Sequence, residues 1–546
     1  MDRRGLPLLL LAAALALGWN LNGYRLLDPD EGRNAEVARE MAVSNDYLIP
    51  HLNGLPYLDK PIVYFAAAAL VMEALGPTEA AARLPAYLAT LATIALLVWF
   101  ARRRWGSAAG WLAGLAFATM PLTLAYAHTA IFDSTLTLFT TVAIVCFFLE
   151  RTTLAWAAIA AGGITKGPVA IAIPLVAMIP YALATGRPLR RLVSLRALAA
   201  FSLVGLPWFI AVTARVPEFP HYAFVHETFE RFTTPTFHRT APWWYYVPIM
   251  SVAAFPWIVP ACARLSAWRA TWAARRDPSS ADSLWLAAWV LGPLALFTLN
   301  HSKLPQYVLP LMPAFALAAA RTLTTAGPRA GWRPYVALAA ALGILLIALP
   351  RGILDTVPLT AAERSAIPPA ALALGIMVLV SAACVAVAAA RRWTGLAGLG
   401  YAVIVMAVPF TTTRLIAAVG DDRSAAALSA AIRAAVPNGS QVLGVAAYPP
   451  SLPFYLGRTI AVATARADEL TSNYISLYQD RFRTFPDSPL LPADSWLDAV
   501  ASCPQPTVFV ARAGNQTARA ALAGLPLLAD DGRYAAYGPC RPHPGG

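Results

Sequence analysis

Charged residues are scarce in this sequence, and so are cysteines and the spacings that mark metal sites. Only 13% of the 546 residues are Asp, Glu, Lys or Arg, against about 25% in an ordinary soluble protein, whereas 58% are hydrophobic. This composition excludes a soluble globular protein and indicates a chain that crosses a membrane several times. The formal net charge is +13, but the arginines lie singly or in short runs between apolar stretches. The charge pattern therefore does not indicate a nucleic-acid-binding domain.

No CxxC pair and no HExxH or His-x-x-x-His spacing is present. We therefore assign no metal ligands and no cofactor, while acids on the outer face leave a divalent cation open. Cys146, Cys262 and Cys384 lie in or at the ends of apolar stretches, where we interpret them as packing residues. Cys503 and Cys540 fall in a predicted external domain, where an oxidising compartment allows a disulfide, and two unrelated thiols remain the alternative.

Thirteen apolar stretches are candidates for membrane helices, for which the template is about 17 to 25 residues. They cover residues 6–22, 84–100, 107–125, 132–149, 153–164, 168–184, 197–214, 246–263, 283–299, 304–321, 334–349, 368–390 and 396–412. The stretch 153–164 is short and adjoins Gly162 and Gly163, so a re-entrant turn is an alternative there. The sequence predicts a polytopic α-helical membrane protein with about 13 transmembrane helices.

Arginine-rich loops alternate with the apolar stretches, and the positive-inside rule places all of them on the cytoplasmic face. Examples are Arg102 to Arg104, Arg187 to Arg196, and Arg391 with Arg392. Ile62 to Leu75 is also apolar, but a span there would invert this topology. We therefore predict a helix in the membrane interface that ends at Gly76. The basic and apolar start also fits a cleaved signal peptide, and we adopt an uncleaved anchor with a cytoplasmic N-terminus.

Residues 416–546 return to a soluble composition. Strand-like runs at Val442 to Ala446, Thr459 to Ala463 and Thr507 to Ala511 alternate with helical stretches such as Thr517 to Ala523. The sequence therefore predicts a small α/β domain at the C-terminus, on the external, periplasmic face. Residues 1–415 are assigned to a transmembrane domain with a long external first loop at 23–83.

The densest charge cluster follows the first apolar stretch and runs from Asp28 to Glu36. Charges are costly to bury beside a bilayer, so both signs gathered at one membrane face suggest a working site. Acids at the start of a helix are also common caps, and we apply this alternative to Asp28.

Other polar residues fall on the same predicted face. They are Asp59 with Lys60, Asp133, Lys166, Arg231, His238 with Arg239, and Lys303 with Tyr307. Cations at this depth suit a lipid-linked phosphate, and the carboxylates of Asp30 and Asp133 suit a general base or an orienter of the acceptor. Trp243 and Trp244 are more typical of an interfacial aromatic belt.

These residues stand in ordered motifs between Pro29 and Pro310. The motifs are Pro-Asp-Glu-Gly-Arg-Asn-Ala-Glu, Leu-Asn-Gly, Asp-Lys-Pro, Asp133, Thr-Lys-Gly, Glu227 to Phe232, His-Arg-x-x-Pro-Trp-Trp-Tyr-Tyr and Lys-Leu-Pro-x-Tyr-x-Leu-Pro. By them the chain resembles the polytopic GT-C glycosyltransferases that use polyprenyl-phosphate sugars. The resemblance is closest to the bacterial lipid A 4-amino-4-deoxy-L-arabinose transferases, which are relatives of protein O-mannosyltransferases.

The resemblance implies an inverting glycosyltransferase of the bacterial inner membrane. It would act as a monomer with an undecaprenyl-phosphate sugar as donor and lipid A or a related envelope molecule as acceptor. The implied catalytic residues are Asp30, Asp133 and Lys60. Lys60, Arg231, Lys303, Arg239 and Tyr307 would bind the donor phosphate. Arg33, Glu31, Lys166 and His238 would support the acceptor and the site.

The chain departs from this group at three places. Thr228 replaces a usual His, Asp59 replaces a usual Glu, and no motif can be matched after about Thr413. Sugar and acceptor therefore stay open, with a protein or another glycolipid as alternative acceptors. Two other classes are also kept, a membrane transporter and a lipid-binding protein on a degenerate transferase frame.

Overall fold

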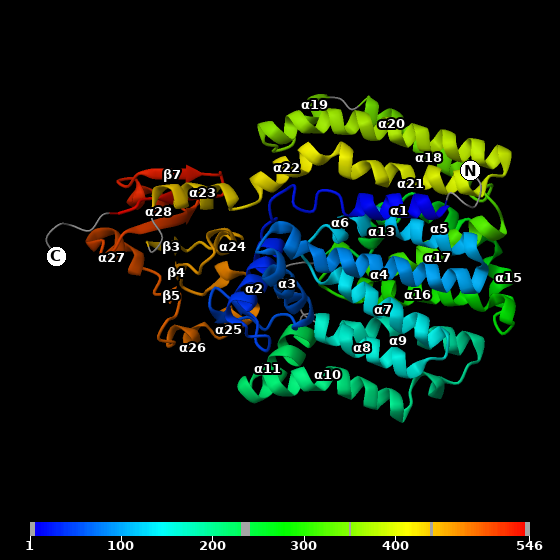
Figure 1. Cartoon of the computed structure of the whole chain (residues 1–546), viewed down its shortest axis with the longest axis horizontal. Helices are drawn as coiled ribbons and strands as arrows, with labels where there is room; N and C mark the ends of the chain where they lie inside the picture. The colour runs from blue at the N-terminus through cyan, green and yellow to red at the C-terminus, as the bar shows by residue number, and fades with distance from the viewer. Residues whose placement is uncertain (1–5, 231–240, 349–350, 437–439, 541–546) are drawn as a thin grey trace. The chain divides into compact units, whose positions relative to one another are not determined.

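The computed structural model describes residues 6–230, 241–348, 351–436 and 440–540 (Figure 1). Their contacts form two compact units. The helical unit comprises Met1–Leu21 and Pro85–Leu415, and the α/β unit comprises Asn22–Leu84 and Ile416–Gly546. Helix α4 (Glu79–Trp105) begins in the α/β unit and continues into the helical unit.

Among its described residues, the helical unit is built from helices joined by turns and loops. They are α1 (Leu6–Leu17), α4, α5 (Ser107–Ala118), α6 (Pro121–Ala127), α7 (Asp133–Phe148), α8 (Thr152–Lys166), α9 (Val169–Thr185), η2 (Leu189–Leu192), α10 (Leu195–Arg215), α11 (Phe219–His221), η3 (Tyr222–Glu230), α13 (Tyr246–Ala253), α14 (Ile258–Cys262), η4 (Leu265–Ala267), α15 (Trp268–Ala273), η5 (Pro278–Ser280), α16 (Ala281–Leu299), η6 (Pro305–Leu311), α17 (Met312–Thr325), α18 (Trp332–Ile347), α19 (Arg351–Leu354), α20 (Ala361–Arg391) and α21 (Thr394–Thr411). Apolar side chains also face outward, as Leu8, Leu11 and Leu15 do on α1. Outward-facing leucines suit a helix that is surrounded by lipid.

Each of the thirteen predicted apolar stretches contains a helix. Among the described residues, six helices are long and apolar enough to cross a membrane by themselves, and up to eight spans result if each bent helix pair counts as one. The bent pairs are α5 with α6, at 64°, and α13 with the helical segment Ile258–Ala273, at 115°. The remaining stretches are shorter helices. Stretch 153–164 forms the continuous helix α8, which packs on α7 and α10.

The α/β unit contains a sheet of six strands among the described residues, in the order β5-β4-β3-β6-β8-β7. The strands are β3 (Gln441–Val445), β4 (Ala461–Ala463), β5 (Leu490–Leu491), β6 (Thr507–Arg512), β7 (Leu527–Asp530) and β8 (Tyr534–Tyr537). β3 pairs in parallel with β4 and β6, and β8 pairs antiparallel with β6 and β7. The three predicted strand runs are thereby confirmed as β3, β4 and β6.

Short helices surround or connect these strands. They are α22 (Thr413–Asp422), α23 (Ala426–Ala435), α24 (Leu452–Leu456), η7 (Asp468–Leu470), α25 (Asn473–Leu477), α26 (Gln479–Arg483), α27 (Ser495–Ser502) and α28 (Gln516–Leu522). Helix α28 coincides with the helical stretch predicted from Thr517 to Ala523. The hydrophobic core of the sheet includes Phe509 and Leu522, which are fully buried.

The first loop packs with the C-terminal segment, whereas the sequence assigns it to the transmembrane domain. It contains α2 (Asp30–Ser44), a hairpin of β1 (His51–Leu52) and β2 (Leu55–Pro56), and α3 (Val63–Leu75). The Asn53 side chain donates to the Ile460 carbonyl at 2.8 Å and accepts from the Ile460 N–H at 2.9 Å. A Cβ on Gly32 would lie 2.6 Å from the Ser451 nitrogen, so only glycine permits this close approach. These contacts join residues about 400 positions apart, which periodicity along the chain does not reveal.

Helix α3 was predicted as an interfacial helix and not as a span. It has 13 residues and ends at Gly76, which has a φ of 80°. Its length falls short of the roughly 20 residues that a transmembrane helix needs. It packs on α2 within the α/β unit.

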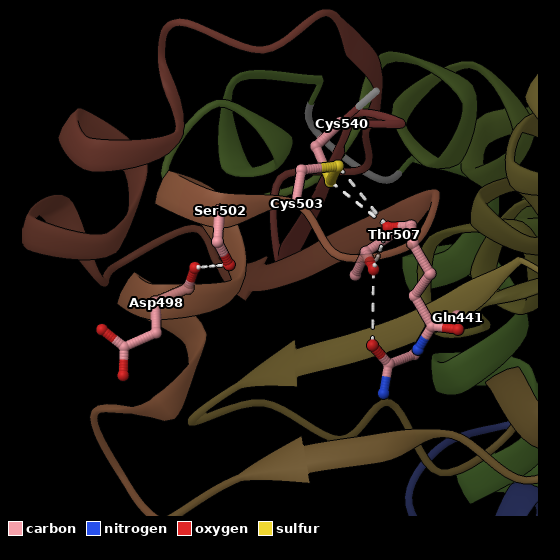
Figure 2. The surroundings of a disulfide bond; sticks show 7 residues. Gln441, Asp498, Ser502, Cys503, Thr507 and Cys540 are labelled. Atoms are coloured by element: carbon pink, nitrogen blue, oxygen red, sulfur yellow. Dashed lines mark hydrogen bonds between the residues drawn. A yellow bond between two sulfur atoms is a disulfide. The ribbon is translucent and has the colours of Figure 1, made fainter. Parts of the chain in front are cut away.

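Cys503 and Cys540, for which two free thiols were the alternative, form a disulfide (Figure 2). The bond joins the residue after α27 to the segment after β8. Cys540 also donates its backbone N–H to the carbonyl of Thr507 at 3.0 Å. Cys540 is thus tied to both the sheet and the residue that follows α27.

Candidate active site

Asp30 is the first residue of α2, where the helix dipole favours a carboxylate. The Arg33 Nη2 donates to the Asp30 Oδ1 at 2.6 Å, one helical turn along. The Asp30 side chain is 44% exposed, whereas the Arg33 side chain is only 12% exposed. The helix therefore presents a carboxylate that solvent or substrate can reach, oriented by an arginine that is mostly buried.

Arg33 makes a second set of contacts with the C-terminal segment. Its Nη1 donates to both the carbonyl oxygen and the Oγ1 of Thr471, at 3.1 Å each. Burial alone lowers the pKa of the Arg33 guanidinium, but Tyr57 and the Asp30 and Asp59 carboxylates raise it by more. The net pKa lies above the ordinary arginine value, so Arg33 stays a cation at every relevant pH.

Glu31 has a different environment from Asp30, although the two are adjacent. It is 1% exposed, and its two oxygens accept from Arg83 Nε and Nη2 at 2.9 Å each. Its Oε2 also accepts from the Leu27 N–H at 3.0 Å. These contacts fix the start of α2 to the first turns of α4. The role of Glu31 in site support stays a prediction.

Asp59 and Lys60 follow the hairpin. The Asp59 carboxylate accepts from the backbone N–H groups of Asn473 and Tyr474, at 3.2 and 2.9 Å. The Lys60 Nζ donates to the carbonyl oxygen of Asp59 at 2.6 Å. Asp59 is 6% exposed. Its carboxylate binds the C-terminal segment, and its backbone carbonyl binds the Lys60 side chain.

Further along α2, Glu36 and Arg39 form a buried pair that the sequence leaves unassigned. Both oxygens of Glu36 accept from Arg39, at 2.6 Å. Burial raises the pKa of Glu36 to about 8, partly offset by the hydrogen bond from Arg39, while Glu40 raises it further. Glu40 in turn accepts from the backbone N–H groups at the tip of the hairpin. This network positions the hairpin on α2.

In the helical unit, Asp133 begins α7 and Lys166 ends α8. The Lys166 Nζ lies 2.5 Å from the Asp133 Oδ1, and the two side chains are 12% and 1% exposed. The same Nζ lies 5.2 Å from the centre of the Tyr307 ring and 5.1 Å from that of Phe132. Three of the predicted site residues, Asp133, Lys166 and Tyr307, thus come together from three separate elements.

Lys303 lies between α16 and η6. It is 8% exposed, and its Nζ donates to the carbonyl oxygen of Asn300 at 2.7 Å. Asn300 also accepts from the Ser302 N–H through its side-chain oxygen at 3.0 Å. This turn keeps the ammonium group close to the C-terminal end of α16, which attracts cations.

Three predicted site residues, Arg231, His238 and Arg239, lie outside the described residues. Just before them, Thr228 donates its hydroxyl to the Ala223 carbonyl at 2.7 Å, within the π-helical turn η3. Within the described part of the chain, no group of three or more His, Cys, Asp or Glu side chains could hold a metal ion. The divalent cation thus stays an open prediction.

The sequence pattern misses the contribution of the C-terminal segment. Thr471, Asn473 and Tyr474 contact Arg33 and Asp59, yet they follow the last recognisable motif by more than a hundred residues. Arg83 could have been noticed as a charge at the start of an apolar helix.

The apolar helices and the C-terminal sheet define a multi-pass membrane protein with a fold of the GT-C type. Residues 59–214 match the family described as dolichyl-phosphate-mannose-protein mannosyltransferase. The chain is 32% identical over 336 residues to the undecaprenyl phosphate-alpha-4-amino-4-deoxy-L-arabinose arabinosyl transferase of Yersinia enterocolitica, which is 59% of each chain. It is 33% identical over 331 residues to the protein of the same name from Pseudomonas aeruginosa, which is 58% of this chain and 59% of that protein. The match thus spans somewhat less than two thirds of these relatives.

Solved structures are similar over nearly the whole chain. The crystal structure of ArnT from Cupriavidus metallidurans bound to undecaprenyl phosphate has 26% sequence identity and a TM-score of 0.83, and 98% of each chain is covered. Its apo form has a TM-score of 0.81 with the same coverage. These comparisons confirm the resemblance to polyprenyl-phosphate-sugar transferases and the GT-C fold inferred from the sequence.

Proposed function

We propose that the protein is an inverting glycosyltransferase that moves a sugar from undecaprenyl phosphate to lipid A or a related envelope acceptor. The preferred sugar is 4-amino-4-deoxy-L-arabinose, because the relatives from Yersinia enterocolitica and Pseudomonas aeruginosa are named for its transfer. The choice of carrier is supported by the Cupriavidus metallidurans protein, which was crystallised with undecaprenyl phosphate.

The observation that carries this proposal is the pair of Asp30 and Arg33 at the start of α2. Their 2.6 Å contact gives a carboxylate that is 44% exposed a fixed direction, while the arginine remains a cation. A reachable, oriented carboxylate beside a permanent cation suits a reaction in which an acceptor oxygen attacks near a phosphate.

In the proposed reaction, the acceptor oxygen attacks the anomeric carbon from the face opposite the phosphate. The bond between that carbon and the phosphate oxygen breaks, and undecaprenyl phosphate leaves with the electron pair. A hydroxyl acceptor gives its proton to Asp30, whereas an ionised phosphate on lipid A has no proton to remove, so Asp30 only orients it. Charge that develops on the leaving phosphate needs nearby cations.

We assign these cations to Lys60 and Lys303, with Tyr307 as a further ligand of the donor phosphate. Arg231 and Arg239 are proposed for the same role. Asp133 and Lys166 supply a second carboxylate and cation in the helical unit, 2.5 Å apart. His238 is proposed as acceptor support.

The proposal includes a location and an assembly state. The protein would act as a monomer in the bacterial inner membrane, with a cytoplasmic N-terminus and a periplasmic C-terminal segment. Reporter fusions after α9 and at the C-terminus test the orientation, since only a periplasmic fusion to alkaline phosphatase is active. Assaying transfer with EDTA and with added Mg²⁺ tests whether a divalent cation takes part.

The decisive experiment combines the purified protein with undecaprenyl-phosphate-linked 4-amino-4-deoxy-L-arabinose and lipid A. Mass spectrometry should show lipid A carrying one additional aminoarabinose. Lipid A from cells with and without the protein provides the matching measurement in vivo. No sugar transfer to lipid A or to any other membrane acceptor would overturn the enzyme assignment.

A further inference from the structure

A short segment of the α/β unit, Thr471 to Tyr474, lies between two groups of predicted site residues. It follows η7 and includes the first two residues of α25. Thr471 has a φ of 54°, a left-handed conformation that is uncommon for a β-branched residue. Such conformations persist where surrounding contacts enforce them, and they concentrate at functional sites.

The conformation of Thr471 has a direct consequence for Arg33. It directs the carbonyl oxygen and the hydroxyl of one residue at the same guanidinium nitrogen, both at 3.1 Å. Because the other terminal nitrogen of Arg33 donates to Asp30, two sides of the guanidinium are held. Thr471 therefore restrains the arginine that orients the proposed acceptor base.

Asn473 and Tyr474 contact Asp59, which belongs to the second group of predicted site residues. The N–H groups of Asn473 and Tyr474 stand at the start of α25, where helix geometry leaves them without carbonyl partners. Both donate to the Asp59 carboxylate. Fixing Asp59 also fixes its carbonyl oxygen, to which the Lys60 Nζ donates at 2.6 Å.

We propose that Thr471–Tyr474 is a positioning segment, which sets Arg33 with Asp30 on one side and Asp59 with Lys60 on the other. The C-terminal α/β segment would thus take part in catalysis without touching the reacting atoms. This inference rests on the proposed function, because Lys60 and Asp30 have roles only in the transfer reaction. A change in the segment should alter donor affinity or turnover more than it alters folding.

Asn473→Pro tests the contact to Asp59. Proline removes the backbone N–H, yet it is well tolerated at the first position of a helix, and Ser472 before it already has extended backbone. Asn473→Ala is the matched control, since it removes the side chain and keeps the N–H. We expect Asn473→Pro to raise the KM for undecaprenyl-phosphate-linked aminoarabinose about 10-fold, while Asn473→Ala stays near the wild-type value.

Thr471→Val tests the contact to Arg33. Valine keeps the branched shape at the left-handed position and removes only the hydroxyl, whereas Thr471→Ser keeps the hydroxyl. We expect Thr471→Val to lower kcat about 5-fold, with the KM for the donor changed less, and Thr471→Ser to retain the wild-type rate. Thermal unfolding of all four variants in detergent should remain within a few degrees of the wild type.

The outcomes separate the two proposals. Without transfer by the wild-type protein, the proposed function fails. With normal transfer by the wild type, equal kinetics of Asn473→Pro and Asn473→Ala, together with equal kinetics of Thr471→Val and Thr471→Ser, would overturn the positioning role. A loss of activity that follows a matching loss of thermal stability in both members of each pair would also overturn it, because it would show a purely structural segment.

Discussion

Arg83 and Glu31 form a two-bond ion pair that is almost completely buried, with the Arg83 Nε and Nη2 each 2.9 Å from a Glu31 oxygen. Arg83 also donates to the carbonyl oxygens of Tyr24 and Arg25, and its guanidinium carbon lies 3.7 Å from the centre of the Tyr24 ring. This pair fixes α2, and with it Asp30, to the beginning of α4.

Removing one partner of this pair should destabilise the protein. We expect Glu31→Gln or Arg83→Met to lower the free energy of unfolding by about 3 kcal/mol, because the remaining charge stays buried without its counterion. The double variant Glu31→Gln with Arg83→Met should lose less than the sum of the two single variants. Thermal unfolding in detergent measures all three. Additive losses would show that the two groups do not depend on each other.

Asp30→Asn tests the proposed base. With a hydroxyl acceptor, kcat should fall by about 100-fold or more, since asparagine cannot take the proton. Asp530→Asn is a suitable control, because Asp530 also pairs with an arginine, Arg519, at 2.7 Å. It should leave transfer unchanged. Near-normal turnover of Asp30→Asn would exclude Asp30 as general base and restrict it to orienting an ionised acceptor.

Lys166→Met should affect both stability and transfer. It leaves the Asp133 carboxylate, 1% exposed, without the cation 2.5 Å away, so we expect a loss of about 3 kcal/mol. Asp133→Asn combined with Lys166→Met should recover much of the stability but not the activity. Recovery of transfer in this double variant would show that the pair is needed for folding alone.

Asp28 predicts a pH dependence of stability. Burial raises its pKa to about 7, although the hydrogen bond from Ser451 and the charge of Arg533 lower it in part. The folded chain therefore holds a proton that the unfolded chain releases near pH 4, and stability should decline as the pH rises from about 4 to about 7. Asp28→Asn should make the fall in Tm between about pH 4 and about pH 7 smaller by about 2 to 4 °C. If the Tm of Asp28→Asn falls with pH as steeply as that of the wild type, the pH dependence of stability comes from other groups.

The disulfide predicts a thiol count. Cys146, Cys262 and Cys384 are free, so the denatured, unreduced protein should show three reactive thiols, and the reduced protein five. Cys503→Ser with Cys540→Ser should lower the free energy of unfolding by about 2 to 4 kcal/mol. Five reactive thiols before reduction would contradict the pairing.

The sequence alone determined the class of the protein and most of its helices. A long apolar stretch in a membrane is stable almost only as a helix, so composition and length were enough to predict most of the helices. The strands β3, β4 and β6 were also predictable, because buried parallel strands are continuous apolar runs. The ordered motifs around Asp30, Lys60 and Lys303 were sufficient to suggest a glycosyltransferase.

Only the tertiary structure decided which residues act together. It joined the first loop to the C-terminal segment through contacts such as that of Arg33 with Thr471, which are 438 positions apart. It also separated two adjacent acids, burying Glu31 against Arg83 and leaving Asp30 within reach. Local sequence patterns encode helix faces and strand alternation, but such pairings depend on how distant segments pack, which no local period records.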